Sequence, residues 1–290
     1  MAISEPRILV AGCGALGSRI AVNLAADAVV YGLKRNVDTL TRDIIPVPGD
    51  LLEEDILEEQ LPDDLDAVVY CLTPNQYDDA GYRDAFVTGL GNLIRALRTR
   101  GQTLNRLLFV SSTGVYHQND DGWVDEDSPT EPEKFSGQRL LEGERLALDS
   151  PWPSTVIRFS GIYGPTRRRF LQSVLSGKIH PPSPGPFTNR IHEDDAAAAA
   201  AHLIRQSLQG NPLEPRYLGS DCEPVRIDEI VDWVRQQVPC DAPQGEASRG
   251  ARAGSKRISN RRLRDSGFEF RYPGYREGYG EMLRELSSAP

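Results

Sequence analysis

The sequence predicts an α/β fold built on a doubly wound parallel sheet, and three observations support this prediction. First, the 290 residues allow one large or two modest globular units, with enough chain to bury a core. Second, 39% hydrophobic and 26% charged residues are typical of a folded chain rather than a disordered one. Third, the N-terminal region alternates apolar runs of strand length with amphipathic runs of helix length, which is the pattern of β-α-β units.

Five strands are expected in the first part of the chain. Each is an apolar run of strand length, and they lie at residues 7–11, 28–33, 44–47, 66–71 and 106–111. Amphipathic stretches predict connecting helices at residues 15–26 and 78–100. Because parallel strands are joined by connections that cross the sheet, helices should cover both of its faces.

The chain changes character after residue 111. The expected elements are, in order, an acidic loop at 122–132, a helix at 133–149, a strand at 155–159, a helix at 170–177 and an alanine-rich helix that ends near residue 208. Residues 181–186 (PPSPGP) are too rich in proline for a helix or a central strand. Residues 241–256 lack periodicity and are expected to form a mobile loop.

Charge and cysteine content argue against several classes of partner. With 33 basic residues against 42 acidic ones, the chain is a poor candidate for a nucleic-acid binder. Its start lacks the pattern of a secretory signal and no apolar run has the length of a membrane span, so no membrane role is expected. The four cysteines form no C-x-x-C pair and the four histidines lack ligand spacing. We therefore expect no metal site and a reducing, cytoplasmic location.

The strongest local signal is a G-x-G-x-x-G run between a predicted strand and a predicted helix, Gly12-Cys13-Gly14-Ala15-Leu16-Gly17. Glycines allow a tight turn and a close backbone approach, and a helix N-terminus offers unpaired N–H groups to a pyrophosphate. In this context the run predicts a dinucleotide site on a Rossmann-like sheet. The competing interpretation is a glycine-rich packing turn, and Cys13 is expected to be a small turn residue rather than a nucleophile.

Two cations, Lys34 and Arg35, end the second predicted strand, where a site that prefers NAD would usually place Asp or Glu on the ribose hydroxyls. Cations cannot accept hydrogen bonds from ribose, but they match a 2′-phosphate in charge and geometry. NADP is therefore the expected cofactor and NAD the alternative. The competing interpretation is a pair of solvated charges at a strand end.

Several motifs in this order resemble those of the extended short-chain dehydrogenase/reductase family, which includes the NAD-dependent epimerases and dehydratases of sugar nucleotides. They are the glycine run, Asp50-Leu51, Ser111-Ser112-Thr113-Gly114-Val115-Tyr116, Arg158 through Ile162-Tyr163-Gly164-Pro165, and Arg190-Ile191-His192-Glu193-Asp194-Asp195. The resemblance runs over nearly the whole chain. It implies a cofactor site, a small-molecule substrate of the nucleotide-sugar type, and a homodimer formed through helices 78–100 and 133–149.

The resemblance also implies roles for individual residues. Asp50 would contact the adenine, Leu51 would pack on it, and Ser112 would be the active-site hydroxyl. Further cofactor contacts are implied for Cys71, Leu72, Thr73, Ser111 and Arg139.

One departure from the family pattern concerns the catalytic pair itself. Members normally carry Tyr-x-x-x-Lys on the helix after the serine, with tyrosine as acid/base and lysine lowering its pKa. Here Phe135 and Arg139 stand at these positions, and a register one residue earlier gives Lys134 and Gln138. Neither register supplies the pair, since phenylalanine has no ionisable proton and arginine does not readily exchange one. The chain therefore resembles an atypical member of the family.

Other residues are weaker candidates for acid/base work. Tyr116 and Tyr163 follow motifs at the carboxyl edge of the sheet, and Tyr77 and Tyr82 follow the fourth strand. Each is also explained as a packing residue that needs only a hydrogen-bond partner. Ser112 has a rival interpretation as a strand-end hydroxyl that satisfies local backbone groups.

The domain prediction places a dinucleotide-binding core at residues 1–160, completed by segments around 188–218, and a smaller substrate-binding lobe over most of 161–290. In that lobe, the arginines at 167–169 suit a diphosphate or a solvated face equally, and Asp194 and Asp195 are expected first as helix caps. Two functions follow: an NADP-dependent oxidoreductase or epimerase-like enzyme with a non-standard acid/base, and a non-catalytic dinucleotide-binding module.

Overall fold

The computed structural model describes residues 5–243 and 254–288, and the chain forms two compact units. Unit 1 comprises Met1–Val115, Glu131–Arg158 and Ala197–Tyr217. Unit 2 comprises Tyr116–Thr130, Phe159–Ala196 and Leu218–Pro290. Each unit is built from three separate stretches of chain. Much of the loop expected at 241–256 lies outside the described residues.

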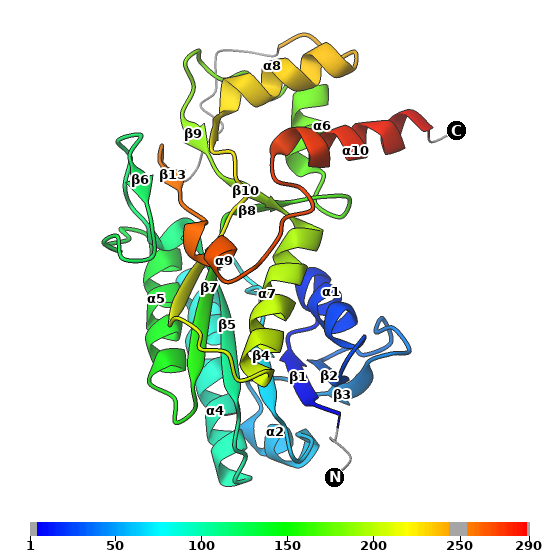
Figure 1. Ribbon diagram of the computed structural model, residues 1–290, viewed down its shortest axis with the longest axis vertical. Helices are drawn as coiled ribbons and strands as arrows, with labels where there is room; N and C mark the ends of the chain where they lie inside the picture. Colours follow the sequence, from blue (N-terminus) through cyan, green and yellow to red (C-terminus); the bar gives the residue numbers. More distant parts are fainter. Residues whose placement is uncertain (1–4, 244–253, 289–290) are drawn as a thin grey trace. The chain divides into compact units, whose positions relative to one another are not determined.

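The centre of unit 1 is a seven-stranded sheet, which confirms the predicted α/β fold class (Figure 1). From one edge to the other its strands are β11 (Arg216–Gly219), β7 (Ser154–Phe159), β5 (Arg106–Ser112), β4 (Ala67–Tyr70), β1 (Arg7–Ala11), β2 (Val29–Lys34) and β3 (Ile45–Pro48). The pairings from β3 through β2, β1 and β4 to β5 are parallel. Strands β2 and β3 follow on one side of β1, and β4 and β5 follow on its other side. The crossover connections therefore run in opposite directions from β1.

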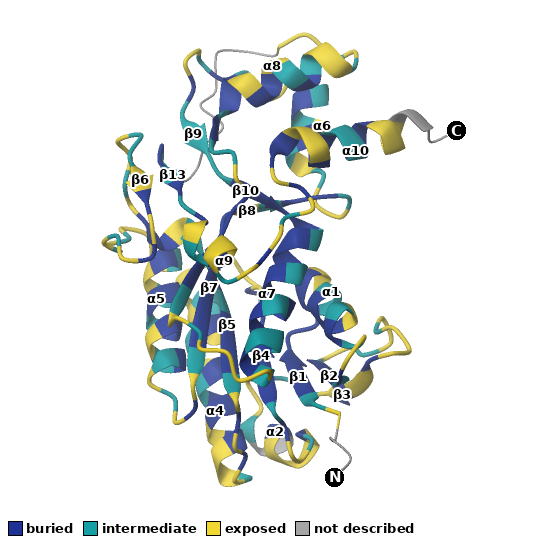
Figure 2. Ribbon diagram, in the orientation of Figure 1, coloured by how far each residue is buried: buried dark blue, intermediate teal, exposed yellow. Residues whose placement is uncertain are grey.

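The central strands are buried on both sides, as a sheet covered on both faces requires. Ile8, Leu9 and Val10 of β1 are fully inaccessible, as are Val68 and Val69 of β4. Figure 2 shows most of these two strands as buried. These runs of β-branched and aliphatic residues are the sequence signal that predicted the strands.

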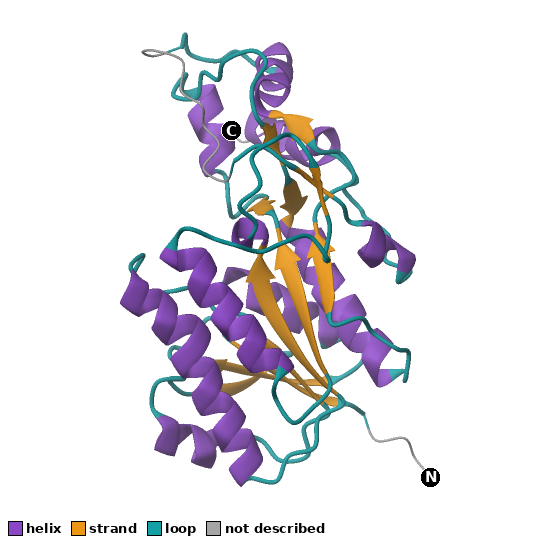
Figure 3. Ribbon diagram, turned by 90° about the vertical axis from the view of Figure 1, so that its left-hand side faces the viewer, coloured by secondary structure: helices purple, strands orange, loops and turns teal. Residues whose placement is uncertain are grey.

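Helices lie on both faces of the sheet, as the crossover connections predict (Figure 3). The helices of this unit are α1 (Ala15–Leu24), α2 (Glu54–Gln60), α3 (Asp79–Arg83), α4 (Gly89–Thr99), α5 (Phe135–Leu148) and most of α7 (Glu193–Leu208). On one face Arg205 of α7 donates to Asp27 just after α1 (2.7 Å). On the other, α4 and α5 pack against each other.

The helix expected at 78–100 contains a turn of π-helix, η1 (Asp84–Thr88), between α3 and α4. Inside this turn the carbonyl of Ala85 accepts a hydrogen bond from the hydroxyl of buried Tyr70 (2.6 Å). Insertion of a side chain into the helical ladder is a common cause of such turns. The amphipathic periodicity does not show this, because the cause lies on strand β4.

The described residues of unit 2 form three two-stranded ladders of very short strands. They are β6 (Trp123–Val124) with β13 (Arg257–Ile258), β8 (Gly161–Tyr163) with β10 (Arg190–His192), and β9 (Phe187–Thr188) with β12 (Val225–Arg226). Strand β6 lies within the segment that was expected to be a loop at 122–132. Strands of two or three residues are too short for an alternating pattern to mark them.

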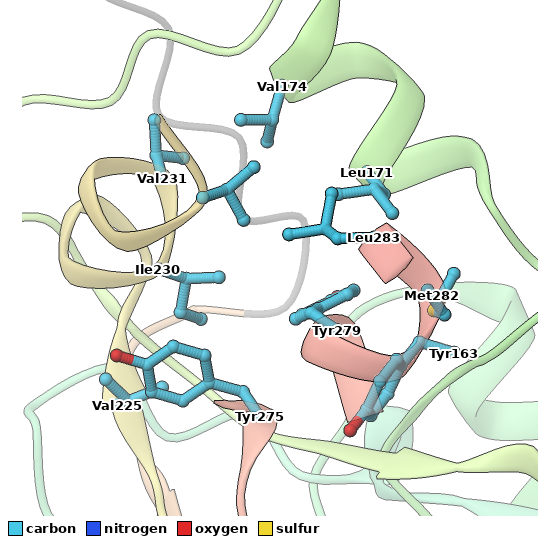
Figure 4. Close-up of a cluster of buried hydrophobic side chains, with 11 residues drawn as sticks. Tyr163, Leu171, Val174, Val225, Ile230, Val231, Tyr275, Tyr279, Met282 and Leu283 are labelled. Atoms are coloured by element: carbon cyan, nitrogen blue, oxygen red, sulfur yellow. The ribbon is translucent and has the colours of Figure 1, made fainter. Parts of the chain in front are cut away.

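Three helices of unit 2 share a hydrophobic cluster, namely α6 (Arg169–Leu175), α8 (Ile227–Gln237) and α10 (Tyr275–Ser288). The unit also contains the short helix α9 (Arg261–Asp265). Figure 4 shows side chains from α6, α8 and α10 pointing toward one another, among them Leu171, Ile230 and Tyr279. Among the described residues no helix is both long and apolar enough to cross a membrane.

Candidate functional site

The glycine run lies in the turn from β1 to α1, and two of its glycines leave no room for a side chain. Gly12 has a φ of +98°, and a Cβ on it would overlap the carbonyl oxygen of Cys71. A Cβ on Gly17 would overlap the carbonyl oxygen of Gly12. The first glycine therefore permits the tight turn beside β4, and the last lets helix α1 pack directly on the turn.

The middle glycine faces open space. A Cβ on Gly14 would meet no atom within 4 Å, and its backbone is in an ordinary extended conformation. Gly14 is also the N-cap of α1 and provides no side-chain hydrogen bond to the helix. The first N–H groups of a helix lack partners within the helix and carry partial positive charge. This open end of α1 fits the pyrophosphate of a dinucleotide.

Cys13 is a packing residue of the turn. Its side chain is fully buried, and its Sγ lies 3.5 Å from the carbonyl oxygen of Val10. Burial raises the pKa of the Cys13 thiol to about 12. The reactive thiolate is therefore suppressed at neutral pH.

The two cations at the end of β2 have partners in different segments: Lys34 in the loop that follows β2, and Arg35 in the segments that follow β4 and β3. Lys34 Nζ donates to Thr39 Oγ1 (2.7 Å), and Arg35 donates to Asn75 Oδ1 (2.8 Å) after β4. Arg35 also lies 3.8 Å from Asp50 Oδ2 after β3, while 61% of its side chain stays exposed. Arg35 therefore spans the carboxyl edge of the sheet with its guanidinium open to solvent. Asn75 was not identified from the sequence, because a single amide in a loop carries no motif.

The residues expected around the adenine and along the cofactor path lie at the same edge. Asp50 accepts a hydrogen bond from the Leu52 backbone (3.0 Å), and Leu51 is buried. Cys71 is buried and its N–H continues the pairing of β4 with β1, whereas Thr73 is exposed. Leu72 lies directly against Gly12, because a Cβ there would be 2.8 Å from its Cδ2.

Ser112, the expected active-site hydroxyl, ends β5. Its Oγ accepts a hydrogen bond from the backbone N–H of Gly114 (3.1 Å). This bond holds the oxygen at the turn and leaves the hydroxyl proton available to another acceptor. A Cβ on Gly137, in the first turn of α5, would be 3.1 Å from the Gly114 carbonyl oxygen. The start of α5 therefore packs against the Ser112 turn.

The neighbouring Ser111 belongs to a buried ionic cluster. Its Oγ donates to Glu144 Oε1 on α5 (2.6 Å). Arg158 on β7 donates to both oxygens of Glu144 (2.9 and 2.6 Å), and both charged side chains are almost completely buried. The sequence did not identify Glu144, although it lies on the same helical face as buried Leu140 and Leu141. The signal in the sequence that could have identified Glu144 is a charged residue on the apolar face of a predicted helix.

Phe135 and Arg139, at the positions of the family's tyrosine and lysine, both contact residues of α3. Arg139 donates to both carboxylate oxygens of Asp79 (2.8 and 2.9 Å) and to Glu142 (2.7 Å), which raises the pKa of its guanidinium. The ring of Phe135 packs edge-on against Tyr82, with centroids 5.5 Å apart. In the other register, Lys134 is the N-cap residue of α5 and Gln138 donates to the Pro132 carbonyl (3.2 Å).

Both weaker tyrosine candidates of unit 2 are buried and bonded to backbone. Tyr116 donates to the carbonyl of Asp125 (2.8 Å), and Tyr163 donates to that of Gly274 (3.5 Å). Burial raises the pKa of Tyr163, and its ring packs at a tilt against that of Tyr279. Both hydroxyls therefore serve packing within unit 2, and neither belongs to unit 1, which carries the glycine run.

The acidic motif after β10 also serves the structure of unit 2. Asp195 is buried and accepts hydrogen bonds from the backbone N–H groups of Arg271 and Tyr272 (2.9 and 2.8 Å). His192 accepts one from the Asp194 backbone (3.2 Å), and burial lowers its pKa. The arginines at 167–169 are exposed or half-buried, as on a solvated face.

Two buried charges of unit 2 remain only partly satisfied. Arg190 Nε and NH1 and Asp221 Oδ2 have no hydrogen-bond partner among the described residues. Burial raises the pKa of Asp221 to about 8, opposed by the nearby charge of Arg190. Asp221 is therefore largely protonated at neutral pH.

A comparison with protein-family models matches residues 8–213 to the NAD dependent epimerase/dehydratase family. No curated protein matches the chain in sequence. Among solved structures, a protein of Methylobacillus flagellatus named for the same family is 36% identical, with a TM-score of 0.82 and coverage of 98% of this chain and 100% of that one.

Two more distant structures share the fold. A UDP-glucose 4-epimerase of Thermus thermophilus, solved with NAD, is 19% identical with a TM-score of 0.76, covering 98% of this chain and 100% of that one. A UDP-glucose 4-epimerase of Thermotoga maritima, solved with UDP-glucose, is 16% identical with a TM-score of 0.77, covering 97% and 100%.

Proposed function

Because the chain belongs to the NAD-dependent epimerase/dehydratase family, we propose that it is an NADP(H)-dependent oxidoreductase that acts on a small molecule. The observation that carries this proposal is the open end of α1 at Gly14, set between two glycines that close the turn. A dinucleotide pyrophosphate is the group that this geometry fits.

The choice of NADP over NAD rests on Lys34 and Arg35. Arg35 presents an exposed guanidinium beside Asp50, and Lys34 adds a second cation at the same strand end. Planar guanidinium groups bind phosphate oxygens through paired hydrogen bonds. A 2′-phosphate on the adenosine ribose would bind there, with Asp50 and Leu51 on the adenine side.

When bound, the nicotinamide supplies the hydride chemistry, and the chain's own residues bind and orient the reactants. Ser112 is the proposed substrate contact, since its hydroxyl is held at the end of β5 and keeps a proton to donate. Cys71, Leu72 and Thr73 would line the cofactor path, with Ser111 and Arg139 near it. A nucleotide sugar is the first substrate class to test, because the epimerase of Thermotoga maritima was solved with UDP-glucose.

The second candidate is a non-catalytic dinucleotide-binding module. It is favoured by one observation: Arg139, at the position of the usual lysine, is engaged by Asp79 and Glu142. In this case cofactor occupancy would alter binding to a partner and no substrate would turn over.

Calorimetric titration with NADP+, NADPH, NAD+ and NADH at one salt concentration tests the proposal. Tighter binding of the phosphorylated pair is expected, and equal binding of all four would contradict the role of Lys34 and Arg35. Binding of none would contradict both candidate functions. A screen of carbonyl compounds and nucleotide sugars with NADPH then separates the enzyme from the non-catalytic module.

A further inference from the structure

The helical face of α5 that resembles the catalytic face of the family is covered by α3. Phe135 packs edge-on against Tyr82, with an angle of 85° between the rings. One turn later, Arg139 forms its paired hydrogen bonds with Asp79. Residues four apart on α5 therefore contact residues three apart on α3, and this arrangement fixes the two helices side by side.

The ring of Tyr82 is held firmly by this packing. Its centroid lies 5.5 Å from Phe135, 5.6 Å from Phe86 and 6.1 Å from Tyr77. These distances and their tilted or edge-on geometries are those that aromatic pairs prefer. The orientation of the phenol is thus determined by three neighbouring rings.

The hydroxyl of Tyr82 differs from those of three other packed tyrosines. Tyr70, Tyr116 and Tyr272 donate to Ala85, Asp125 and Glu281. Within the described residues, the hydroxyl of Tyr82 has no hydrogen-bond partner, although its side chain is half-buried. A fixed ring with an unengaged hydroxyl is suited to bind or to transfer a proton.

Tyr82 and the Ser112 turn both contact the first turn of α5. Phe135 and Gly137 both belong to the first turn of α5, and Gly137 packs against the carbonyl of Gly114. The N–H of Gly114 in turn holds Ser112 Oγ. The phenol of Tyr82, on α3, therefore lies beside Phe135 of α5.

We propose that Tyr82 replaces the missing tyrosine as the proton donor of a carbonyl reduction. This inference rests on the proposed NADP(H)-dependent function. When bound in its reduced form, the nicotinamide would supply a hydride, with its two electrons, to the carbonyl carbon, and the carbonyl π bond would break toward oxygen. That oxygen takes the proton of the Tyr82 hydroxyl, and the resulting phenolate regains a proton from water. Ser112 donates a second hydrogen bond to the same oxygen.

The surroundings of Tyr82 suit donation more than abstraction of a proton. Burial, with a smaller contribution from Tyr77, raises the pKa of Tyr82. The charged residues on the elements around it are Asp79 and Arg83 on α3, Asp84 on η1, and Arg139, Glu142, Glu144 and Arg145 on α5. Arg139 is engaged by both Asp79 and Glu142. No lysine of the family pattern lowers the pKa, so the phenol stays protonated at neutral pH, which is the form that can donate a proton in a reduction.

Nuclear magnetic resonance of protein labelled at the tyrosine Cζ carbon tests the proposal without a substrate. The Tyr82 signal is assigned by its loss in Tyr82→Phe, and Tyr77→Phe is the matched control. Saturation with NADP+, whose oxidised ring is cationic, should lower the titration midpoint of Tyr82 by about one pH unit relative to NADPH. The Tyr77 signal should change less.

The outcomes separate this inference from the proposed function. If the protein binds neither NADP+ nor NADPH in calorimetry, the proposed function fails. If both bind and the Tyr82 midpoint is the same with each, the assignment of Tyr82 is overturned and the cofactor proposal stands.

Kinetics give a second readout on the first carbonyl compound that the protein reduces. Tyr82→Phe should lower kcat by about a hundredfold, with KM and NADPH affinity unchanged. The double variant Tyr82→Phe/Phe135→Tyr moves the phenol to the family position and should recover part of the rate. An unchanged kcat in Tyr82→Phe would overturn the proposal.

Discussion

Gly12 and Gly14 lie two positions apart in one turn, and only Gly14 leaves room for a side chain. We expect Gly12→Ala to lower the free energy of unfolding by at least about 2 kcal/mol, because it combines a strained φ with overlap. Gly14→Ala should leave stability unchanged and weaken NADP+ binding, since its methyl group occupies the proposed pyrophosphate position. Denaturant unfolding and calorimetry measure the two effects. Full NADP+ affinity in Gly14→Ala would place the pyrophosphate elsewhere.

Arg35 provides the test of cofactor choice. Replacing it with Asp should weaken NADPH binding roughly tenfold to a hundredfold, because a charge-assisted bond to the 2′-phosphate is replaced by repulsion. NADH binding should change much less. Arg42 is an exposed arginine beyond β2, and Arg42→Asp is a control for the change in net charge. Equal losses for the two nucleotides would contradict the proposed phosphate contact.

At the scale of residues, the sequence predicted motifs better than it predicted contacts. The glycine run was identified because its spacing is itself the geometric requirement of the turn. Asn75 and Glu144 were not, because their partners lie 40 and 14 residues away in the chain. Such contacts depend on which strands become neighbours, and local patterns do not contain that information.

At the scale of elements, the cluster of Ser111, Glu144 and Arg158 joins β5, α5 and β7. We expect Arg158→Met to lower the free energy of unfolding by about 3–5 kcal/mol, because it leaves a buried carboxylate without its cation. The double variant Glu144→Leu/Arg158→Met removes both charges and should recover most of this loss. Urea unfolding of the three proteins measures the difference. A double variant as unstable as Arg158→Met would show that the charges themselves stabilise the fold.

The boundaries of the elements show where the hydrophobic pattern of the sequence is enough to predict a helix or strand. Strand β1 was predicted with its observed bounds because four of its five residues are apolar, and the bounds of α5 differ from the prediction by one or two residues. The π-turn η1 was missed, since the hydroxyl of Tyr70 on β4 enters that helix. The paired strands of unit 2 were also missed. Two or three residues in a ladder are determined by their partner strand rather than by their own sequence.

For the whole molecule, Asp221 makes stability depend on pH. Burial raises its pKa from 3.8 to about 8, so the folded state retains a proton that the unfolded state has released. This contribution is fully present below about pH 4 and is lost as the pH rises to about 8. Asp221→Asn mimics the protonated form and should exceed the parent in stability at pH 8 by at least about 2 kcal/mol.

Thermal unfolding at several pH values measures this dependence. The advantage of Asp221→Asn should be small near pH 4 and should grow with pH. Asp232 is an exposed aspartate on α8, and Asp232→Asn is the matched control, with no growing advantage expected. An advantage of Asp221→Asn that is constant over this range would rule out a proton held in the folded state.

The division of each unit into three stretches of chain has a consequence for biosynthesis. The sheet of unit 1 receives its edge strand β11 only from residues 216–219, after two segments of unit 2 have been made. A nascent chain that ends at residue 160 carries six of the seven strands and the complete glycine turn, but neither α7 nor the outer edge strand. While translation continues, strand β7 is an unpaired edge with buried side chains, the kind of surface that chaperones protect. Most of the chain must therefore be synthesised before unit 1 can complete its own sheet.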